Sequence, residues 1–284
     1  MSGGFKSRGF KVTPGVAGGM YIGDATWPEV GEHLAEGTPA LVPLGSTEQH
    51  GPHLPLSTDH VIAEGLARAA ADRAEPPCIC TPTVTIGVSP HHRQFHGTMS
   101  VDADAFRDYV ESLSRSLADQ GIDRIVYVNA HGGNVEPLRE VGRRLHDDGT
   151  AYAIEWMWNE SIPELVDELF AQNGPHAGPK ETAMVWHLAD LVRTSELAAA
   201  RDGGCPDLTE VRTERHGARL FYDAIENSDN GAFGDPTDAT AEKGERLFEA
   251  ACGQLVELCE WLADQPWEEL APRSHVRDRD DICG

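Results

Sequence analysis

Basic residues are scarce in this chain, and lysine is the scarcest of them. The 284 residues include 23 Lys plus Arg against 47 Asp plus Glu, which gives a formal charge of -24. Only four of the basic residues are lysines: Lys6, Lys11, Lys180 and Lys243. A nucleic-acid interface and a contact with an anionic membrane both need a basic face, so the composition argues against both kinds of partner.

The surplus of acids favours a protein adapted to high salt. At about 1 M salt the screening length falls to roughly 3 Å, which removes most of the repulsion between surface carboxylates. The alternative is an ordinary acidic protein, because extreme charge bears on solubility rather than on fold.

The chain also lacks long apolar runs and paired cysteines. No run of about 18 apolar residues occurs, so no membrane span is predicted. Residues 1–19 are glycine-rich without a continuous apolar stretch, which is not the pattern of a secretory signal. None of the six cysteines forms a CxxC pair. We therefore expect buried, reduced thiols and a cytoplasmic location, with a disulfide framework as the alternative.

Short apolar runs alternate along the chain with segments whose apolar residues recur at helical spacing. Strands are predicted at 40–44, 78–86, 125–128 and 151–156, and helices at 59–74, 102–120, 135–146, 163–171, 181–190 and 239–263. Residues 200–237 are rich in Gly, Asp and Asn, which indicates loops with short elements. The alternation predicts an α/β fold, a three-layer α/β/α sandwich with a mostly parallel central sheet. We expect a single domain over 1–284, with loose termini at 1–19 and 272–284.

Residues of metal-ligand type follow the first of these strands. Glu48 and His50 lie two residues apart, so in extended backbone their side chains point the same way. Asp59 begins the next predicted helix and can return to the same place after a turn rich in Gly and Pro. Ligand sites in open α/β sheets form beyond the carboxyl ends of the strands, where these residues lie.

Two further clusters fit the same site. His131 follows the strand at 125–128, and Gly132 and Gly133 let a ligand approach the backbone closely. His176 lies in a loop just before Glu181; one of the two could be a ligand and the other an acid or base. Mixed imidazole and carboxylate ligands suit Zn²⁺ or Mn²⁺ better than Mg²⁺ or Ca²⁺. A carboxylate can bridge two ions, so the set predicts a two-metal site.

The remaining histidines have a simpler interpretation. A lone histidine is more often a structural or surface residue than a ligand. We assign that interpretation to His53, His91, His96, His146, His187, His216 and His275.

Five stretches together resemble the creatininase family of metal-dependent amidohydrolases. They are GSTEQHGPHLPLSTD (45–59), GVSPHHRQFHGT (87–98), NAHGGN (129–134), HAGPKET (176–182) and GDPTDATAEKG (234–244). They are long, in the family's order and spread over about 200 residues. The resemblance implies an α/β/α sandwich, commonly a hexamer, with two divalent ions that activate a water to attack an amide carbonyl.

The resemblance also implies roles for individual residues. Glu48, His50, Asp59 and His131 match the metal ligands, with Asp59 as the bridging one. His176 matches the catalytic histidine, the proton donor to the leaving nitrogen, and Glu181 matches an active-site glutamate that completes the metal shell or acts as acid or base. Ser89 matches a substrate-binding position, and Trp158, beside Trp156, lies near an aromatic lid position or, alternatively, is packed in the core. From the residues themselves, we expect the backbone N–H groups of Gly132 and Gly133 to bind the substrate by stabilising the oxyanion.

Two departures from the family pattern bear on the substrate. Members that hydrolyse creatinine carry a glutamate ligand where this chain has Gly133, and His96 stands where a proline is usual. Both argue against creatinine itself. The HGGN form resembles members that deformylate a formamidopyrimidine intermediate of flavin and deazaflavin synthesis, and a peptidase that matures the mycofactocin precursor.

The prediction is therefore a cytoplasmic hydrolase of a non-peptide C–N bond, dependent on two divalent ions, Zn²⁺ or Mn²⁺ with Fe²⁺ as an alternative. Its expected partners are a small-molecule amide substrate and other copies of the chain. The alternatives are creatinine hydrolysis, formamidopyrimidine deformylation, cleavage of a mycofactocin-type peptide, and a metal-binding relative without catalysis.

Overall fold

The centre of the structure, a computed structural model that describes residues 19–205, 214–216 and 218–273, is a parallel sheet. Its five strands lie in the order β1-β3-β2-β4-β5, and every pair is parallel. They are β1 (Met20–Tyr21), β2 (Ala40–Leu44), β3 (Ile79–Cys80), β4 (Arg124–Asn129) and β5 (Tyr152–Met157). Leu44 pairs with Asn129, so β2 and β4 end level at the same edge.

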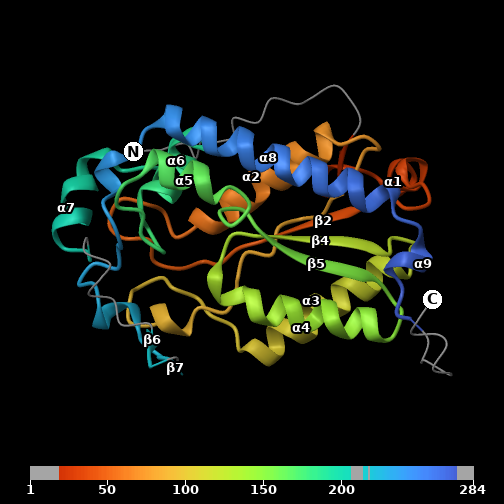
Figure 1. Cartoon of the computed structure of the whole chain (residues 1–284), viewed down its shortest axis with the longest axis horizontal. Coiled ribbons are helices and arrows are strands. Elements are labelled where there is room, and N and C mark those ends of the chain that lie inside the picture. The colour runs from red at the N-terminus through yellow and green to blue at the C-terminus, as the bar shows by residue number, and fades with distance from the viewer. Residues whose placement is uncertain (1–18, 206–213, 217, 274–284) are drawn as a thin grey trace, which may run out of the picture.

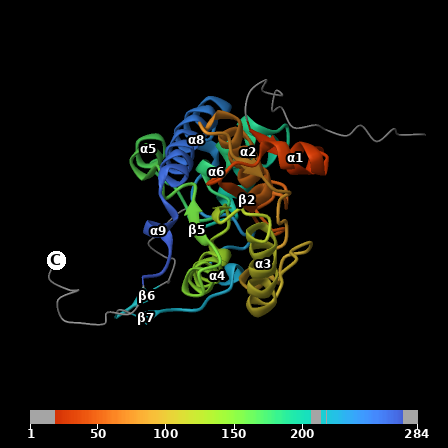
Figure 2. The same cartoon turned by 90° about the vertical axis from the view of Figure 1, so that its right-hand side faces the viewer.

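Helices cover both faces of this sheet (Figures 1 and 2). One face carries α2 (Thr58–Arg73), α6 (Pro179–Leu188) and α8 (Ala241–Asp264), and the other carries α3 (Ala103–Ala118) and α4 (Val135–Asp147). This is the predicted three-layer α/β/α sandwich, with a sheet that is parallel throughout.

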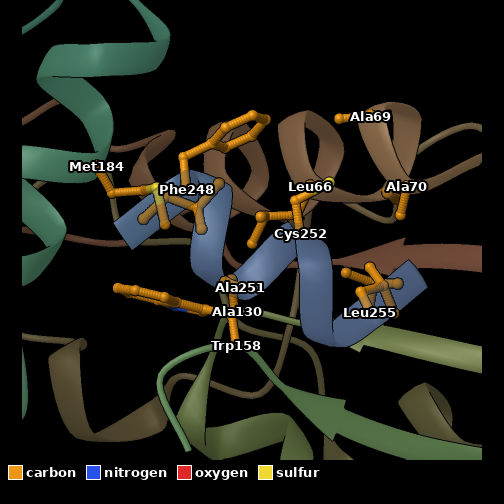
Figure 3. Close-up of a cluster of buried hydrophobic side chains, with 14 of the residues drawn as sticks. Leu66, Ala69, Ala70, Ala130, Trp158, Met184, Phe248, Ala251, Cys252 and Leu255 are labelled. Carbon is orange, nitrogen blue, oxygen red and sulfur yellow. The ribbon is translucent and has the colours of Figure 1, made fainter. Parts of the chain in front are cut away.

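Alternation along the strands divides the apolar core into two layers. In β2, Leu41 packs with the helices α2, α6 and α8, whereas Val42 and Leu44 pack with α3 and α4. Figure 3 shows part of the first layer, where Trp158 lies near Ala130, which follows β4, and near Ala251 of α8. Trp158 is 1% exposed, and this placement favours the core alternative for that side chain.

Shorter elements surround the sandwich. Four helices are α1 (Trp27–His33), α5 (Pro163–Leu169), α7 (Leu197–Asp202) and α9 (Trp267–Leu270). An antiparallel pair is formed by β6 (Glu214–Arg215) and β7 (Ala218–Arg219). Single 3-10 turns occupy Ile22–Asp24, Pro90–His92, Gly132–Asn134, Thr194–Glu196, Ala224–Glu226 and Pro236–Asp238.

The strand predicted at 78–86 is wrong over most of its length. Only Ile79–Cys80 pairs as a strand, and beyond it Val84 makes an isolated bridge to Leu44. Pro82 has no N–H to donate, so regular pairing stops there and resumes only at the bridge. The helix predicted from residue 181 begins two residues earlier, at Pro179, in the first turn where proline is tolerated.

Three remaining expectations concern the chain ends, the cysteines and membrane spans. The predicted loose termini, 1–19 and 272–284, lie almost wholly outside the described residues, as do His275 and Cys283. The other five cysteines are buried, as predicted, and form no disulfide with one another. None of the helices within 19–273 that are described is long and apolar enough to cross a membrane.

Candidate metal centre

The predicted ligands meet beyond the carboxyl ends of β2 and β4. Glu48 and His50 follow β2, His131 follows β4, and Asp59 lies in the first turn of α2. All four are buried, with no side chain more than 4% exposed. Because parallel neighbours end at one edge, His131 meets residues that are 72 to 83 positions earlier in the sequence.

Asp59 lies between two sets of ligands. Its Oδ1 is 3.0 Å from His50 Nε2, and its Oδ2 is 3.2 Å from His131 Nδ1. Glu48 Oε1 is 3.3 Å from the same His131 nitrogen, and Glu181 Oε2 is 4.0 Å from His50 Nε2. One set is therefore Glu48, Asp59 and His131, and the other is His50, Asp59 and Glu181.

Backbone carbonyls fix which nitrogen of each histidine faces the carboxylates. His50 Nδ1 is 3.2 Å from the Glu48 carbonyl oxygen, and His131 Nε2 is 3.0 Å from that of Val88. A carbonyl only accepts, so these nitrogens carry the protons. In the neutral rings, the other nitrogens, His50 Nε2 and His131 Nδ1, have lone pairs directed at the carboxylates. Metal-binding imidazoles are oriented in this way, by a hydrogen bond from the nitrogen that does not bind the metal.

The residues fit divalent ions because buried polar atoms without hydrogen-bond partners converge at one place. Both carboxylate oxygens of Glu48, together with His50 Nε2 and Asp59 Oδ2, are buried and make no hydrogen bond within the described residues. Buried polar atoms without partners are costly, and cations between them would satisfy all four. Glu48, His50 and Asp59 have ligand atoms within 4.8 Å of one another, and so do His50, His176 and Glu181. Their imidazole and carboxylate chemistry suits Zn²⁺ or Mn²⁺.

The electrostatics of the cluster also favour a cation. Burial alone would raise the pKa of Glu48, but His131, His176 and His92 together hold that pKa well below its ordinary value. Burial would lower the pKa of His50, yet Asp59, Glu181 and Glu48 raise it to about 9. Metal binding at such a site releases the protons that the ring nitrogens otherwise hold, so metal affinity rises with pH.

His176 lies against this cluster with one nitrogen open. Its Nε2 is 2.7 Å from the Gln49 carbonyl oxygen and donates to it, while its Nδ1 is 3.5 Å from Glu48 Oε1. Its ring centroid is 4.2 Å from those of His50 and His92. Burial, followed by the two neighbouring imidazoles, holds the pKa of His176 well below its ordinary value. The ring is therefore neutral, with a lone pair on Nδ1.

Gln49 and His92 belong to the centre although the sequence did not single them out. Gly51 N–H donates to Gln49 Oε1 at 2.9 Å, and Gln49 Nε2 donates to the Gly231 carbonyl at 3.1 Å. These backbone groups orient the amide so that its second hydrogen points at His92 Nδ1, 2.8 Å away. His92 then carries its proton on Nε2, 3.5 Å from Glu48 Oε1, and directs a hydrogen rather than a lone pair at that ligand.

The residues predicted to bind substrate lie at different distances from the predicted ligands. Ser89 is fully buried, and its hydroxyl contacts His131 Nε2 at 3.1 Å and Ser46 Oγ at 2.5 Å, on the side of the ring away from the carboxylates. Gly132 and Gly133 lie in the 3-10 turn directly after His131. Trp158 packs in the core, as described above. Glu181 Oε2 accepts a hydrogen bond from Ala177 N–H, which directs that carboxylate toward His50.

Sequence relatives of this chain are hydrolases. It is 37% identical over 244 residues to the mycofactocin precursor peptide peptidase of Mycobacterium ulcerans (strain Agy99), covering 83% of this chain and 84% of that protein. It is 28% identical over 280 residues to the creatinine amidohydrolase of Pseudomonas putida, covering 89% and 98%. It is also 31% identical over 160 residues to a formylaminopyrimidine nucleotide deformylase of Methanothermus fervidus (strain ATCC 43054 / DSM 2088 / JCM 10308 / V24 S), covering 55% and 59%.

Solved structures share the fold. A creatininase with manganese matches with a TM-score of 0.70 and 22% identity, over 90% of this chain and 100% of that one. A creatininase variant of the Zn–Zn type matches with a TM-score of 0.71 and 22% identity, over 89% and 98%. The family model described as creatinine amidohydrolase matches residues 23–259. By this match and by its relatives, the chain belongs to the creatininase family of amidohydrolases.

Proposed function

We propose that this protein hydrolyses an amide bond with two divalent metal ions. The observation that carries the proposal is the position of Asp59, whose two oxygens face two separate ligand sets. Glu48 and His131 would hold one ion, His50 and Glu181 the other, and Asp59 would bridge them. Such ions, when bound, lower the pKa of a water and polarise the carbonyl that it attacks.

The protein's own groups complete the reaction. His176 is neutral with an open Nδ1, so it can accept a proton released when water attacks and then donate it to the leaving nitrogen. Its Nε2–H bond to the Gln49 carbonyl fixes the ring during this transfer. Gly132 and Gly133 follow His131 directly, and their backbone N–H groups would stabilise the developing oxyanion.

For the substrate, we propose a peptide bond as the first candidate. The matches at 34–37% identity that cover about four fifths of this chain are mycofactocin precursor peptide peptidases. A pocket of about 420 Å³ is lined by His91, Arg93, Phe221 and Tyr222. It adjoins the centre, because a nitrogen of His91 lies within 4.8 Å of ligand atoms of Glu48 and His131. A small cyclic amide would leave this space unfilled, whereas residues flanking a peptide bond would enter it. The non-peptide amide expected from the sequence shares the same metal chemistry and differs in its leaving group.

Replacing Asp59 tests the metal proposal. We expect Asp59→Ala to lose both ions and all measurable turnover, because one side chain serves both ligand sets. Metal content by mass spectrometry and hydrolysis of an amide panel give the two readouts. Asp108→Ala, on the exposed side of α3, is the control and should keep both. Two bound ions in purified Asp59→Ala would refute the bridging role.

A substrate panel tests the peptide assignment. The purified metal-loaded protein would be offered a mixed-sequence peptide library, creatinine, and a formamidopyrimidine nucleotide. Hydrolysis would be measured by mass spectrometry of the products. We expect the highest kcat/KM with peptides. Faster hydrolysis of creatinine or of the formamide would overturn the peptide assignment and leave the metal proposal intact.

A further inference from the structure

His91 lies beside the first ligand set although the sequence pattern left it among the structural histidines. It is the middle residue of the 3-10 turn Pro90–His92. Its ring is nearly parallel to that of His131, at 7° and with centroids 5.9 Å apart. One of its nitrogens lies within 4.8 Å of ligand atoms of Glu48 and His131, so the three form a group able to hold an ion.

The ring of His91 is not engaged elsewhere. Within the described residues it makes no hydrogen bond, and its contacts are with the rings of His92 and His131. His92, one residue on, differs because its Nδ1 accepts from Gln49 and its Nε2 carries the proton. A lone pair at the centre is thus available from His91 and not from His92.

The backbone around Gly133 shows that residue 133 cannot supply a ligand. A Cβ atom at residue 133 would lie 2.0 Å from the Val88 carbonyl oxygen, so no side chain can reach the ion from that position. The segment that excludes it, residues 87–92, is the one that carries His91. The first set otherwise supplies only Glu48, Asp59 and His131, and Zn²⁺ can expand its coordination to about five ligands.

We propose that His91 is a further ligand of the ion held by Glu48, Asp59 and His131. The inference rests on the proposed two-metal function and assigns a residue to one of its two ions. It predicts that His91 sets the affinity of that ion alone, because the second set of His50, Asp59 and Glu181 lies on the other side of Asp59.

The test compares His91→Ala with His96→Ala, an exposed histidine of the same loop. Each protein would be stripped, titrated with Zn²⁺ against a chelator of known affinity, and reloaded with Co²⁺ for visible absorption. We expect His91→Ala to bind one ion roughly tenfold or more weakly, with an altered Co²⁺ spectrum for that ion, while the other ion binds as in the wild type. His96→Ala should match the wild type in both measurements.

The outcomes separate this inference from the function on which it rests. Two ions bound by His91→Ala with wild-type affinities and spectra would overturn the ligand assignment, even if turnover fell, because His91 would then act on the substrate. A wild-type protein that binds no divalent ion would overturn the proposed function itself. Thermal unfolding of the stripped variants confirms that both remain folded.

Discussion

At the scale of single residues, the metal centre contains side chains that a sequence pattern predicts and others that no sequence pattern predicts. Glu48 and His50 share a face by the two-residue period of extended chain, and parallel pairing brings His131 beside them. Gln49 and His92 take their roles from the Gly231 carbonyl, which lies 182 residues from Gln49 in the sequence. No local period encodes that contact, so their part in the centre became visible only in the structure.

The burial of His53 leads to a prediction about the stability of the protein at acidic pH. It is fully buried; its Nε2 lies 2.9 Å from Thr182 Oγ1, and its Nδ1 has no partner among the described residues. Burial, aided by His50, lowers the pKa of His53 to about 4. Above about pH 6.5 the ring is neutral in both folded and unfolded states. Below that pH only the unfolded state takes up the proton, so stability falls as the pH drops toward 4.

The change expected from this one group is roughly 2 kcal/mol between pH 7 and pH 5. Urea unfolding at both pH values, with chelator present, would measure it. His53→Gln, which can still donate to Thr182 but does not titrate, should lose about that much of the pH dependence. His96→Gln should retain the wild-type dependence, and an equal slope in His53→Gln would contradict the assignment.

At the scale of elements, length and regularity decide what the sequence reveals. The long helices 58–73, 135–147 and 241–264 were predicted to within two residues because several turns repeat the same apolar period. Helices α1, α7 and α9 have only seven, six and four residues and show too few turns for a period. The strand at 78–86 failed for a different reason: its apolar composition is that of a strand, but Pro82 interrupts the ladder.

The contact between α6 and α8 gives an element-scale prediction, since α6 carries Glu181. A Cβ atom on Gly244 of α8 would lie 1.9 Å from the Ala183 carbonyl oxygen of α6. We expect Gly244→Ala to cost roughly 1–3 kcal/mol, because the helices must separate. Gly253 lies in the same helix with nothing within 4 Å of an added Cβ. Gly253→Ala should therefore stabilise by about 0.5–1 kcal/mol.

Chemical denaturation of the two glycine variants measures both effects. Because displacement of α6 also moves Glu181, the Gly244 variant should bind metal more weakly, whereas the Gly253 variant should bind as the wild type does. Equal stabilities of the two variants would show that the close approach of α6 and α8 does not limit the packing.

At the scale of the whole molecule, the acids of the metal centre are a small minority. Glu48, Asp59 and Glu181 account for three of the 47. Arginines on α3 and α4 form local ion pairs, such as Arg115 with Glu111 and Asp148, and Arg144 with Glu140. Such exposed pairs contribute little individually. The 23 basic residues cannot neutralise the 47 acidic ones, and the chain keeps a surplus of 24 negative charges.

This surplus predicts that folding depends on salt. At about 0.1 M salt, charges roughly 10 Å apart still repel one another, whereas at about 1 M the screening length is roughly 3 Å. If screening contributes about 4 kcal/mol, the Tm of a chain this long should rise by roughly 10 °C between the two conditions. Thermal unfolding in KCl, with sucrose at matched osmolality as the uncharged control, distinguishes screening from general solute exclusion. A Tm that is already maximal in dilute buffer, or that rises equally in sucrose, would mean that the acids are not an adaptation to salt.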